Sequence, residues 1–190
     1  MGSVPVGEQW ERTLPARGRF PLSPGALYRL ESGAVRLLTW DPQGEMVTLN
    51  ICGAGEVLGL PLCWVGGSEA VVECLTRARL RQIPPQQWGE EVLGLCRYSQ
   101  QVQELLCILQ LRSIPERLQR LIRCLDRRFG RQIPSGRLVD LPLSHRQIAE
   151  TLGTTRVTIT RLLSRYQNQG RLRRAFRRLI LLDPSLWAQD

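Results

Sequence analysis

The chain has 190 residues, of which 43% are hydrophobic, so it can bury one large or two small cores and is not a disordered protein. Its apolar runs are short and are broken by Arg, Gln or Pro, which excludes a membrane-spanning helix of about 20 apolar residues. The N-terminal stretch MGSVPVGEQWERTL lacks a signal-peptide core, so we expect a cytoplasmic protein.

Charge divides the chain into two halves. All 26 basic residues are arginine, and the formal net charge is +9. Residues 1–112 carry 10 Arg against 11 Asp and Glu, whereas residues 113–190 carry 16 Arg against 6. This asymmetry predicts that the C-terminal half meets a polyanion, with an ordinary solvated basic face as the alternative.

The six cysteines contain no CxxC pair, and the single His145 cannot complete a zinc site with them by close spacing. We therefore expect no metal centre. The cysteines are interpreted as small buried hydrophobic residues, with a redox-sensing thiol as the alternative. They are Cys52, Cys63, Cys74, Cys96, Cys107 and Cys124.

Residues 20–83 show short β-like runs separated by turn residues: ALYRLESGAVRLLTW, EMVTLNIC and AVVECLTRARLRQI, divided by DPQG and GAGE. Strands of about six to eight residues with such punctuation predict an antiparallel sandwich or small barrel rather than βαβ units. The pair Pro84 and Pro85 closes this part.

The period changes in LGLCRYSQQVQELLCILQLR, residues 93–112, where apolar or aromatic residues recur at steps of three and four. This is the spacing of a helix that packs along a partner, so it predicts a dimer seam; the alternative is a helix packed only on its own domain. The seam residues are Leu95, Tyr98, Val102, Leu105 and Leu109. The helix is expected to end near Ser113, and a new one to start at Pro115.

The next segment, PERLQRLIRCLDRRFG, predicts a helix with one apolar face that Gly130 stops. That face consists of Leu118, Leu121, Ile122 and Leu125. A loop with Pro134, Ser135 and Gly136 then leads to the short segment RLVDLPL.

Residues 145–165 have the spacing of a helix-turn-helix. Ser144 can cap the first helix, Gly153 can end it where a positive φ is needed, and Thr155 can cap the second helix. The predicted inward-facing residues are Ile148, Ala149, Leu152, Ile159, Leu162 and Leu163.

The second helix has an unusual outward face. At about 100° per residue, Val157 falls near the middle of an otherwise polar arc that contains Arg156, Thr160, Arg161, Ser164 and Arg165. In a DNA major groove a valine can contact a thymine methyl group, and the flanking arginines suit guanine or phosphate. The alternative is that Val157 packs against a neighbouring loop or tolerates exposure.

After Gly170 the sequence RLRRAFRRLILLD predicts a basic hairpin, or wing, whose arginines would contact backbone phosphate. An ordinary solvated hairpin is the alternative.

These motifs together resemble the CRP/FNR family of bacterial transcription regulators. The strings that carry the resemblance are LYRLESGAVRLL, GEVLGL and above all LSHRQIAETLGTTRVTITRLLSRYQNQGRL. Within that family, TRVTITRLL and GAVRLLTWDPQGEMVTLNICGAGEVLGL are most similar to the nitrogen-regulator branch of cyanobacteria.

The resemblance implies an α+β fold: an antiparallel β-roll like the jelly roll of cyclic-nucleotide-binding domains, a long dimerisation helix and a winged helix-turn-helix. We expect these parts at residues 1–94, 95–113 and 114–190. The implied partners are double-stranded DNA, a second copy of the chain and RNA polymerase.

The resemblance also implies the DNA contacts. Arg156, Val157 and Arg161 would contact bases in a palindrome with GTA and TAC half-sites. Family members that respond to cAMP have an acidic residue where this chain has Val157, which implies a different half-site. The residues expected at the DNA backbone are Ser144, His145, Thr155, Thr160, Arg165, Arg173 and Arg174.

The sensor departs from the family pattern. Leu60 and Pro61 follow Gly59 where cAMP-binding members have Glu, and the loop CWVGGSEAVVE contains no arginine to hold a phosphate. We therefore expect no cAMP binding. The resemblance also suggests 2-oxoglutarate, but the loop arginine expected near Ser68 is missing, and Arg112 is the remaining candidate anion partner. Candidate effector residues are thus Gly59, Leu60 and Arg112, and the effector is left open.

Two other functions are weighed against DNA binding. An effector-binding or protein-interaction module with a winged helix that no longer docks on DNA is the alternative, and the intact face of Arg156, Val157 and Arg161 speaks against it. An enzyme is the weakest option, because no nucleophile, carboxylate pair or metal set converges in the sequence.

Overall fold

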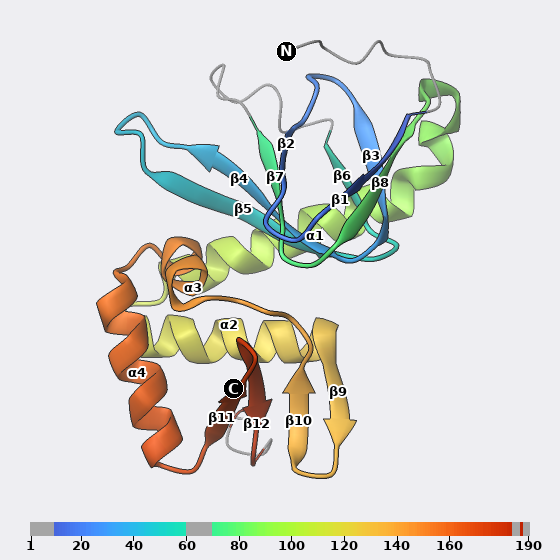
Figure 1. Cartoon of the computed structure of the whole chain (residues 1–190). Coiled ribbons are helices and arrows are strands. Elements are labelled where there is room, and N and C mark those ends of the chain that lie inside the picture. Colours follow the sequence, from blue (N-terminus) through green and yellow to red (C-terminus); the bar gives the residue numbers. More distant parts are fainter. Residues whose placement is uncertain (1–9, 60–69, 184–186, 188–190) are drawn as a thin grey trace. The chain divides into compact units, whose positions relative to one another are not determined.

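The computed structural model describes residues 10–59, 70–183 and 187 (Figure 1). The chain divides into two compact units, Met1–Glu104 and Leu105–Asp190. Within the described residues, no helix combines the length and the apolar character that crossing a membrane requires.

The first unit is built from two antiparallel sheets (Figure 1). One sheet has the strand order β1-β8-β3-β6 and the other β2-β7-β4-β5. The strands are β1 (Glu11–Leu14), β2 (Arg19–Pro21), β3 (Leu27–Ser32), β4 (Ala34–Trp40), β5 (Met46–Gly53), β6 (Val57–Gly59), β7 (Val71–Cys74) and β8 (Ala78–Ile83). The antiparallel architecture predicted for residues 20–83 is confirmed. Strands β1, β2 and β6 were not predicted individually, since three or four residues are too few to show an alternating pattern.

The core of the first unit combines aliphatic side chains with a group of aromatic rings. The rings of Trp10 and Phe20 stack with their centroids 4.8 Å apart, and the Trp10 and Tyr28 rings meet edge to face at 5.7 Å. Tyr98 belongs to the same buried cluster, although it comes from a helix rather than a strand. The helix therefore completes the hydrophobic interior of the β-roll.

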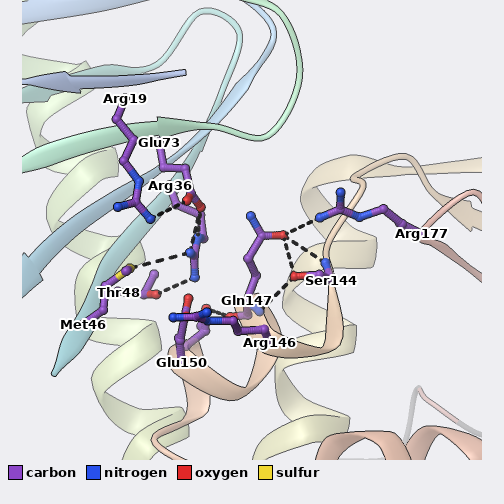
Figure 2. Close-up of polar contacts among 11 residues, drawn as sticks. Arg19, Arg36, Met46, Thr48, Glu73, Ser144, Arg146, Gln147, Glu150 and Arg177 are labelled. Carbon is purple, nitrogen blue, oxygen red and sulfur yellow. Dashed lines mark hydrogen bonds and ion pairs between the residues drawn. The ribbon is translucent and has the colours of Figure 1, made fainter. Parts of the chain in front are cut away.

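A buried ion pair lies on the sheet β2-β7-β4-β5 (Figure 2). The side chain of Arg36 is 1% exposed, and its Nη2 donates to Glu73 Oε2 at 2.7 Å while Nη1 donates to Thr48 Oγ1 at 3.3 Å. Arg19 donates to the other carboxylate oxygen of Glu73 at 3.1 Å. Removing one partner of such a pair costs about 3–5 kcal/mol, because the other charge stays buried and unpaired.

A 3₁₀-helix, η2 (Pro85–Glu91), and the long helix α1 (Val92–Gln110) follow β8. The sheet part ends at Ile83, immediately before the two prolines, as predicted. Two consecutive hydrogen bonds hold α1 on the β-roll. Asn50 Nδ2 donates to Gln101 Oε1 at 2.9 Å, and Gln101 Nε2 donates to Glu56 Oε1 at 2.6 Å.

Beyond the end of α1, the described residues of the second unit form the helices α2, α3 and α4 and an antiparallel sheet with the strand order β11-β12-β10-β9. Its elements are α2 (Ile114–Phe129), β9 (Gly130–Ile133), β10 (Gly136–Val139), α3 (His145–Leu152), α4 (Arg156–Asn168), β11 (Leu172–Ala175) and β12 (Arg178–Leu181). The predicted start of α2 is confirmed by a capping box between Ser113 and Glu116. The stretch predicted as a loop followed by a short segment is instead the hairpin β9–β10.

Packing in the second unit follows the predicted apolar faces. The four residues assigned to the inner face of α2 are all buried, and so are Ile148, Ala149 and Leu152 of α3 and Ile159 and Leu163 of α4. Leu162, which was also predicted to face inward, is only half-buried. This core holds α3 and α4 in fixed orientation, with their polar sides left outside.

Candidate nucleic-acid interface

The helices α3 and α4 form a tight helix-turn-helix. Ser144 Oγ accepts a hydrogen bond from the Gln147 backbone at 3.1 Å, and Gln147 Oε1 accepts one from the Ser144 backbone at 2.9 Å, which closes a capping box. Gly153 ends α3 with φ at 62°, the left-handed conformation that favours glycine. Thr155 then caps α4 by accepting from the Thr158 backbone at 3.2 Å. All three local predictions are confirmed.

The outward face of α4 carries the predicted base-contacting residues. Arg156, Val157 and Arg161 are all exposed, and Val157 has 57% of its surface accessible. Val157 is therefore not packed against a neighbouring loop, which removes one of the two alternatives for it. This face of α4 therefore offers a small apolar surface between two exposed guanidinium groups.

The predicted wing is the hairpin β11–β12, with Phe176 and Arg177 as the two residues of its turn. Both residues have positive φ, 47° and 68°, in a turn type that normally selects Asn and Gly. The side chain of Phe176 is 92% exposed. The chain therefore holds a large apolar ring in solvent at the wing tip, in a backbone conformation that phenylalanine rarely adopts.

A cleft of about 450 Å³ opens among α3, α4 and the wing. Its lining residues are Ser144, His145, Arg146, Arg156, Arg174 and Arg177. Four of these six are arginines, so the cleft is strongly cationic and suits a phosphate group.

The residues expected at the DNA backbone fall into two groups. Arg165 and Arg173 are exposed cations. The others already bond within the unit: Ser144 and Thr155 cap helices, and Thr160 Oγ1 donates to Arg156 O at 2.9 Å. These hydrogen bonds help to hold α3 and α4 in place.

Arg174 has a structural role as well. Its Nη2 donates to Leu143 O at 2.8 Å and to Arg177 O at 3.1 Å, so it fastens the wing tip to the segment before α3. Burial, and then the neighbouring charge of Arg177, lower the pKa of Arg174. A guanidinium held in this way supplies positive charge to the cleft from a fixed position.

Two lining residues of the cleft, Arg146 and Arg177, were not among the predicted site residues. Arg146 pairs with Glu150 at 2.8 Å, and Arg177 donates to Gln147 Oε1 at 3.0 Å (Figure 2). The arginine run of the wing was visible in the sequence, but the contact of Arg177 with α3 spans 30 residues and leaves no local signal.

Of the three candidate effector residues, the structure describes Gly59 and Arg112. Leu60, Pro61 and Ser68 lie outside the described residues. Gly59 ends β6 with φ at 111°, and a Cβ there would meet Ala26 O at 2.3 Å, so the glycine is required by close strand packing. Arg112 is exposed and belongs to the second unit.

The side of α1 predicted as a dimer seam packs inside the chain over much of its length. Tyr98 is part of the β-roll core, Val102 packs against that core, and Leu95 packs against a second cluster of the same unit. Leu105 is buried and Leu109 is half-buried. Tyr98 therefore lies in the interior of the helix's own unit, whereas the seam role of Leu95, Val102, Leu105 and Leu109 stays a prediction.

The described cysteines are not uniformly buried. Cys52, Cys74 and Cys124 are buried, as predicted, and desolvation followed by the charge of Glu73 raises the pKa of Cys74 to about 11. Cys96 and Cys107 on α1 are exposed. Cys63 lies outside the described residues. The prediction of buried hydrophobic cysteines is therefore wrong for the two on α1.

Comparisons with known proteins agree with this geometry. Residues 117–186 match the model of the Crp-like helix-turn-helix domain. The regulatory protein CysR of Synechococcus elongatus is 35% identical over 88% of this chain and 82% of its own length. The global nitrogen regulator of Synechocystis sp. is 31% identical over 84% of this chain and 76% of its own length.

The fold also agrees with solved structures. A transcriptional regulator of the CRP family from Thermus thermophilus superposes with a TM-score of 0.72 and 24% identity, covering 95% of this chain and 94% of that chain. That likeness shows the fold, whereas the identity with CysR shows the family. The chain belongs to the CRP/FNR family of transcription regulators.

Proposed function

We propose that this regulator acts as a homodimer that binds a palindromic DNA site, with one α4 in each of two major grooves. The observation that carries the proposal is the exposed face of Arg156, Val157 and Arg161 next to the arginine-lined cleft. A solvated helix gains nothing from an exposed valine at this point, whereas a helix in a major groove can use it against a thymine methyl group.

The sequence preference follows from the chemistry of the three side chains. Arg156 and Arg161 each offer a planar fork that suits O6 and N7 of guanine, and Val157 offers a branched apolar surface to thymine. These contacts fit a half-site of the GTA type with its complement TAC, which is the half-site that the family resemblance suggests. Each well-formed bidentate contact discriminates against a wrong base by about 1–3 kcal/mol.

Binding strength comes mainly from phosphate contacts. Arg165 and Arg173 are exposed on α4 and the wing, and the cleft adds further positive charge. Each neutralised phosphate lowers the slope of log K against log salt concentration by about 0.9. We therefore expect the affinity for any duplex to fall steeply with salt concentration. The base contacts add a preference for one sequence.

The dimer is proposed to form along the exposed side of α1. Leu93 and Leu106 are large apolar residues with 73% and 55% of their surface accessible. Leu93 begins an exposed stripe in which steps of three and four recur, and Leu106 lies beside that stripe. The stripe consists of Leu93, Cys96, Gln100, Gln103, Cys107 and Gln110. That spacing suits a parallel helix pair in a coiled coil. RNA polymerase is proposed as the further partner of the DNA-bound dimer.

The proposal is tested by measuring affinity for three duplexes by fluorescence anisotropy at salt concentrations from about 50 to about 300 mM. The duplexes contain the GTA/TAC palindrome, one half-site with a scrambled second half, or a random sequence. We expect the palindrome to bind at least about 100-fold more tightly than the random duplex at about 150 mM salt. Equal affinity for all three duplexes would overturn sequence-specific binding, and no detectable binding of any duplex would favour a winged helix that does not dock.

A further inference from the structure

His145 is the chain's single histidine, and its side chain lines the cationic cleft. It is the first residue of α3, directly after the capping Ser144. No other histidine competes for protons near neutral pH, so a change in protonation there can be assigned to one side chain.

The hydrogen bonds of His145 determine which ring nitrogen carries the proton. His145 Nδ1 lies 2.8 Å from Thr160 Oγ1, and Thr160 Oγ1 donates its only proton to Arg156 O at 2.9 Å. The hydroxyl therefore accepts from the imidazole, and Nδ1 is the protonated nitrogen. In the neutral ring, Nε2 then holds a lone pair and cannot donate to an anion.

The charged groups that line the cleft with His145 are all arginines. Arg156 comes from α4, Arg174 and Arg177 from the wing, and Arg146 from α3 itself, where it is paired with Glu150. Each of these guanidinium groups adds a positive charge to the surroundings of the imidazole. Burial, followed by the charges of Arg174 and Arg156, lowers the pKa of His145, which favours the neutral imidazole in the free protein.

We propose that the cleft binds one phosphate group of the DNA backbone and that His145 takes up a proton as the phosphate enters. This inference rests on the proposed DNA binding. The neighbouring arginines repel a positively charged imidazole. The negative charge of the phosphodiester offsets this repulsion, so it favours protonation of His145. A protonated Nε2 can then donate a charge-assisted hydrogen bond to a phosphate oxygen.

Thermodynamic linkage gives the direction of the pH dependence. In this proposal the pKa of His145 is higher in the DNA complex than in the free protein. DNA affinity therefore increases as the pH falls through the pKa of the complex. The increase ends below the lowered pKa of the free protein, where both states are protonated. Between the two values, the slope of log K against pH approaches minus one per protomer.

Calorimetry measures the proton uptake directly. The full-length chain is titrated with a palindromic duplex at pH 7 in Pipes, Hepes and Tris, whose ionisation enthalpies differ. We expect the wild-type chain to take up a measurable fraction of one proton per protomer. His145→Gln should bind DNA with no such uptake, whereas Arg173→Gln, which loses an exposed wing charge, should bind more weakly but keep the uptake.

A second measurement does not depend on any variant. The single histidine has one C2–H signal in the proton NMR spectrum of the wild-type chain, and its titration reports the pKa with and without DNA. We expect the pKa to increase on binding. DNA binding with no proton uptake and an unmoved titration would overturn this inference alone, whereas failure of the wild-type chain to bind any DNA would overturn the proposed function and this inference together.

Discussion

At the scale of single residues, the proposed role of Val157 is to set which DNA sequence is preferred. A glutamate at this position can accept from the exocyclic amino group of cytosine but cannot contact a thymine methyl group favourably. We expect Val157→Glu to change the preferred base pair by about 1–3 kcal/mol of discrimination while DNA binding persists. Selection of bound duplexes from a random pool measures this. Val157→Ala is the control, expected to weaken the thymine preference without creating a new one; an identical preferred site for Val157→Glu and wild type would refute the methyl contact.

Phe176 gives a prediction about stability. Its φ of 47° is costly for phenylalanine by about 1–2 kcal/mol, whereas asparagine tolerates this conformation through local hydrogen bonds. Phe176→Asn should therefore increase the free energy of unfolding by roughly 0.5–1 kcal/mol. Urea denaturation followed by circular dichroism measures the change. Phe176→Ala removes the same exposed ring but lacks the side-chain amide that makes local hydrogen bonds in this conformation, so equal stability of the two variants would contradict the backbone explanation.

Residue roles were predictable where they depend on near neighbours in the chain. The caps at Ser144 and Thr155 and the positive φ of Gly153 are visible in the sequence because each involves residues at most four positions away. The buried pair of Arg36 and Glu73 was not predictable, since an arginine in an apolar strand gives no sign of a carboxylate 37 residues away.

At the scale of elements, α1 shows that periodicity predicts a helix without indicating what its apolar face packs against. The same spacing of three and four arises whether an apolar face packs on another chain or on the helix's own domain. Here Tyr98 and Val102 belong to the β-roll core, and the exposed stripe that includes Leu93 lies elsewhere on the helix. The sequence alone could not distinguish the two faces, because both carry apolar residues.

The dimer prediction follows from that exposed stripe. Leu93→Asp combined with Leu106→Asp should convert the protein to monomers, because two buried like charges per chain would oppose pairing. Sedimentation velocity measures the oligomeric state, and circular dichroism checks that the monomer stays folded. Phe176→Asp, which alters an equally exposed apolar residue away from α1, should remain dimeric. A double variant that sediments as a dimer would exclude this face as the seam.

Short strands are a second kind of element that the sequence pattern does not reveal. The hairpin β9–β10 begins directly at the end of α2 and has four residues in each strand, too few for alternation to stand out. Its contacts are nevertheless specific: Asp140, just after β10, accepts from Arg178 at 2.6 Å and from Arg131 at 3.2 Å. These hydrogen bonds, with that to Arg178 the stronger, lower the pKa of Asp140.

At the scale of the whole molecule, the division of charge along the sequence matches the division of the chain into two compact units. The strongly basic segment 113–190 falls within the second compact unit, and the near-neutral segment 1–104 forms the β-roll unit. Composition can predict this because net charge is a sum over many residues and does not depend on their exact contacts. The cationic cleft could not be predicted as a cavity, since residues from α3, α4 and the wing must first be brought together by the fold.

The most direct test of sequence-specific, dimeric binding is selection of DNA sites by the full-length wild-type chain from a random pool, followed by sequencing of the bound fraction. We predict an enriched inverted repeat with GTA-type and TAC-type halves, whose centres are about 10 base pairs apart because the two recognition helices lie one helical turn apart along the duplex. An enriched pool without inverted symmetry, or no enrichment over the starting pool, would contradict this prediction.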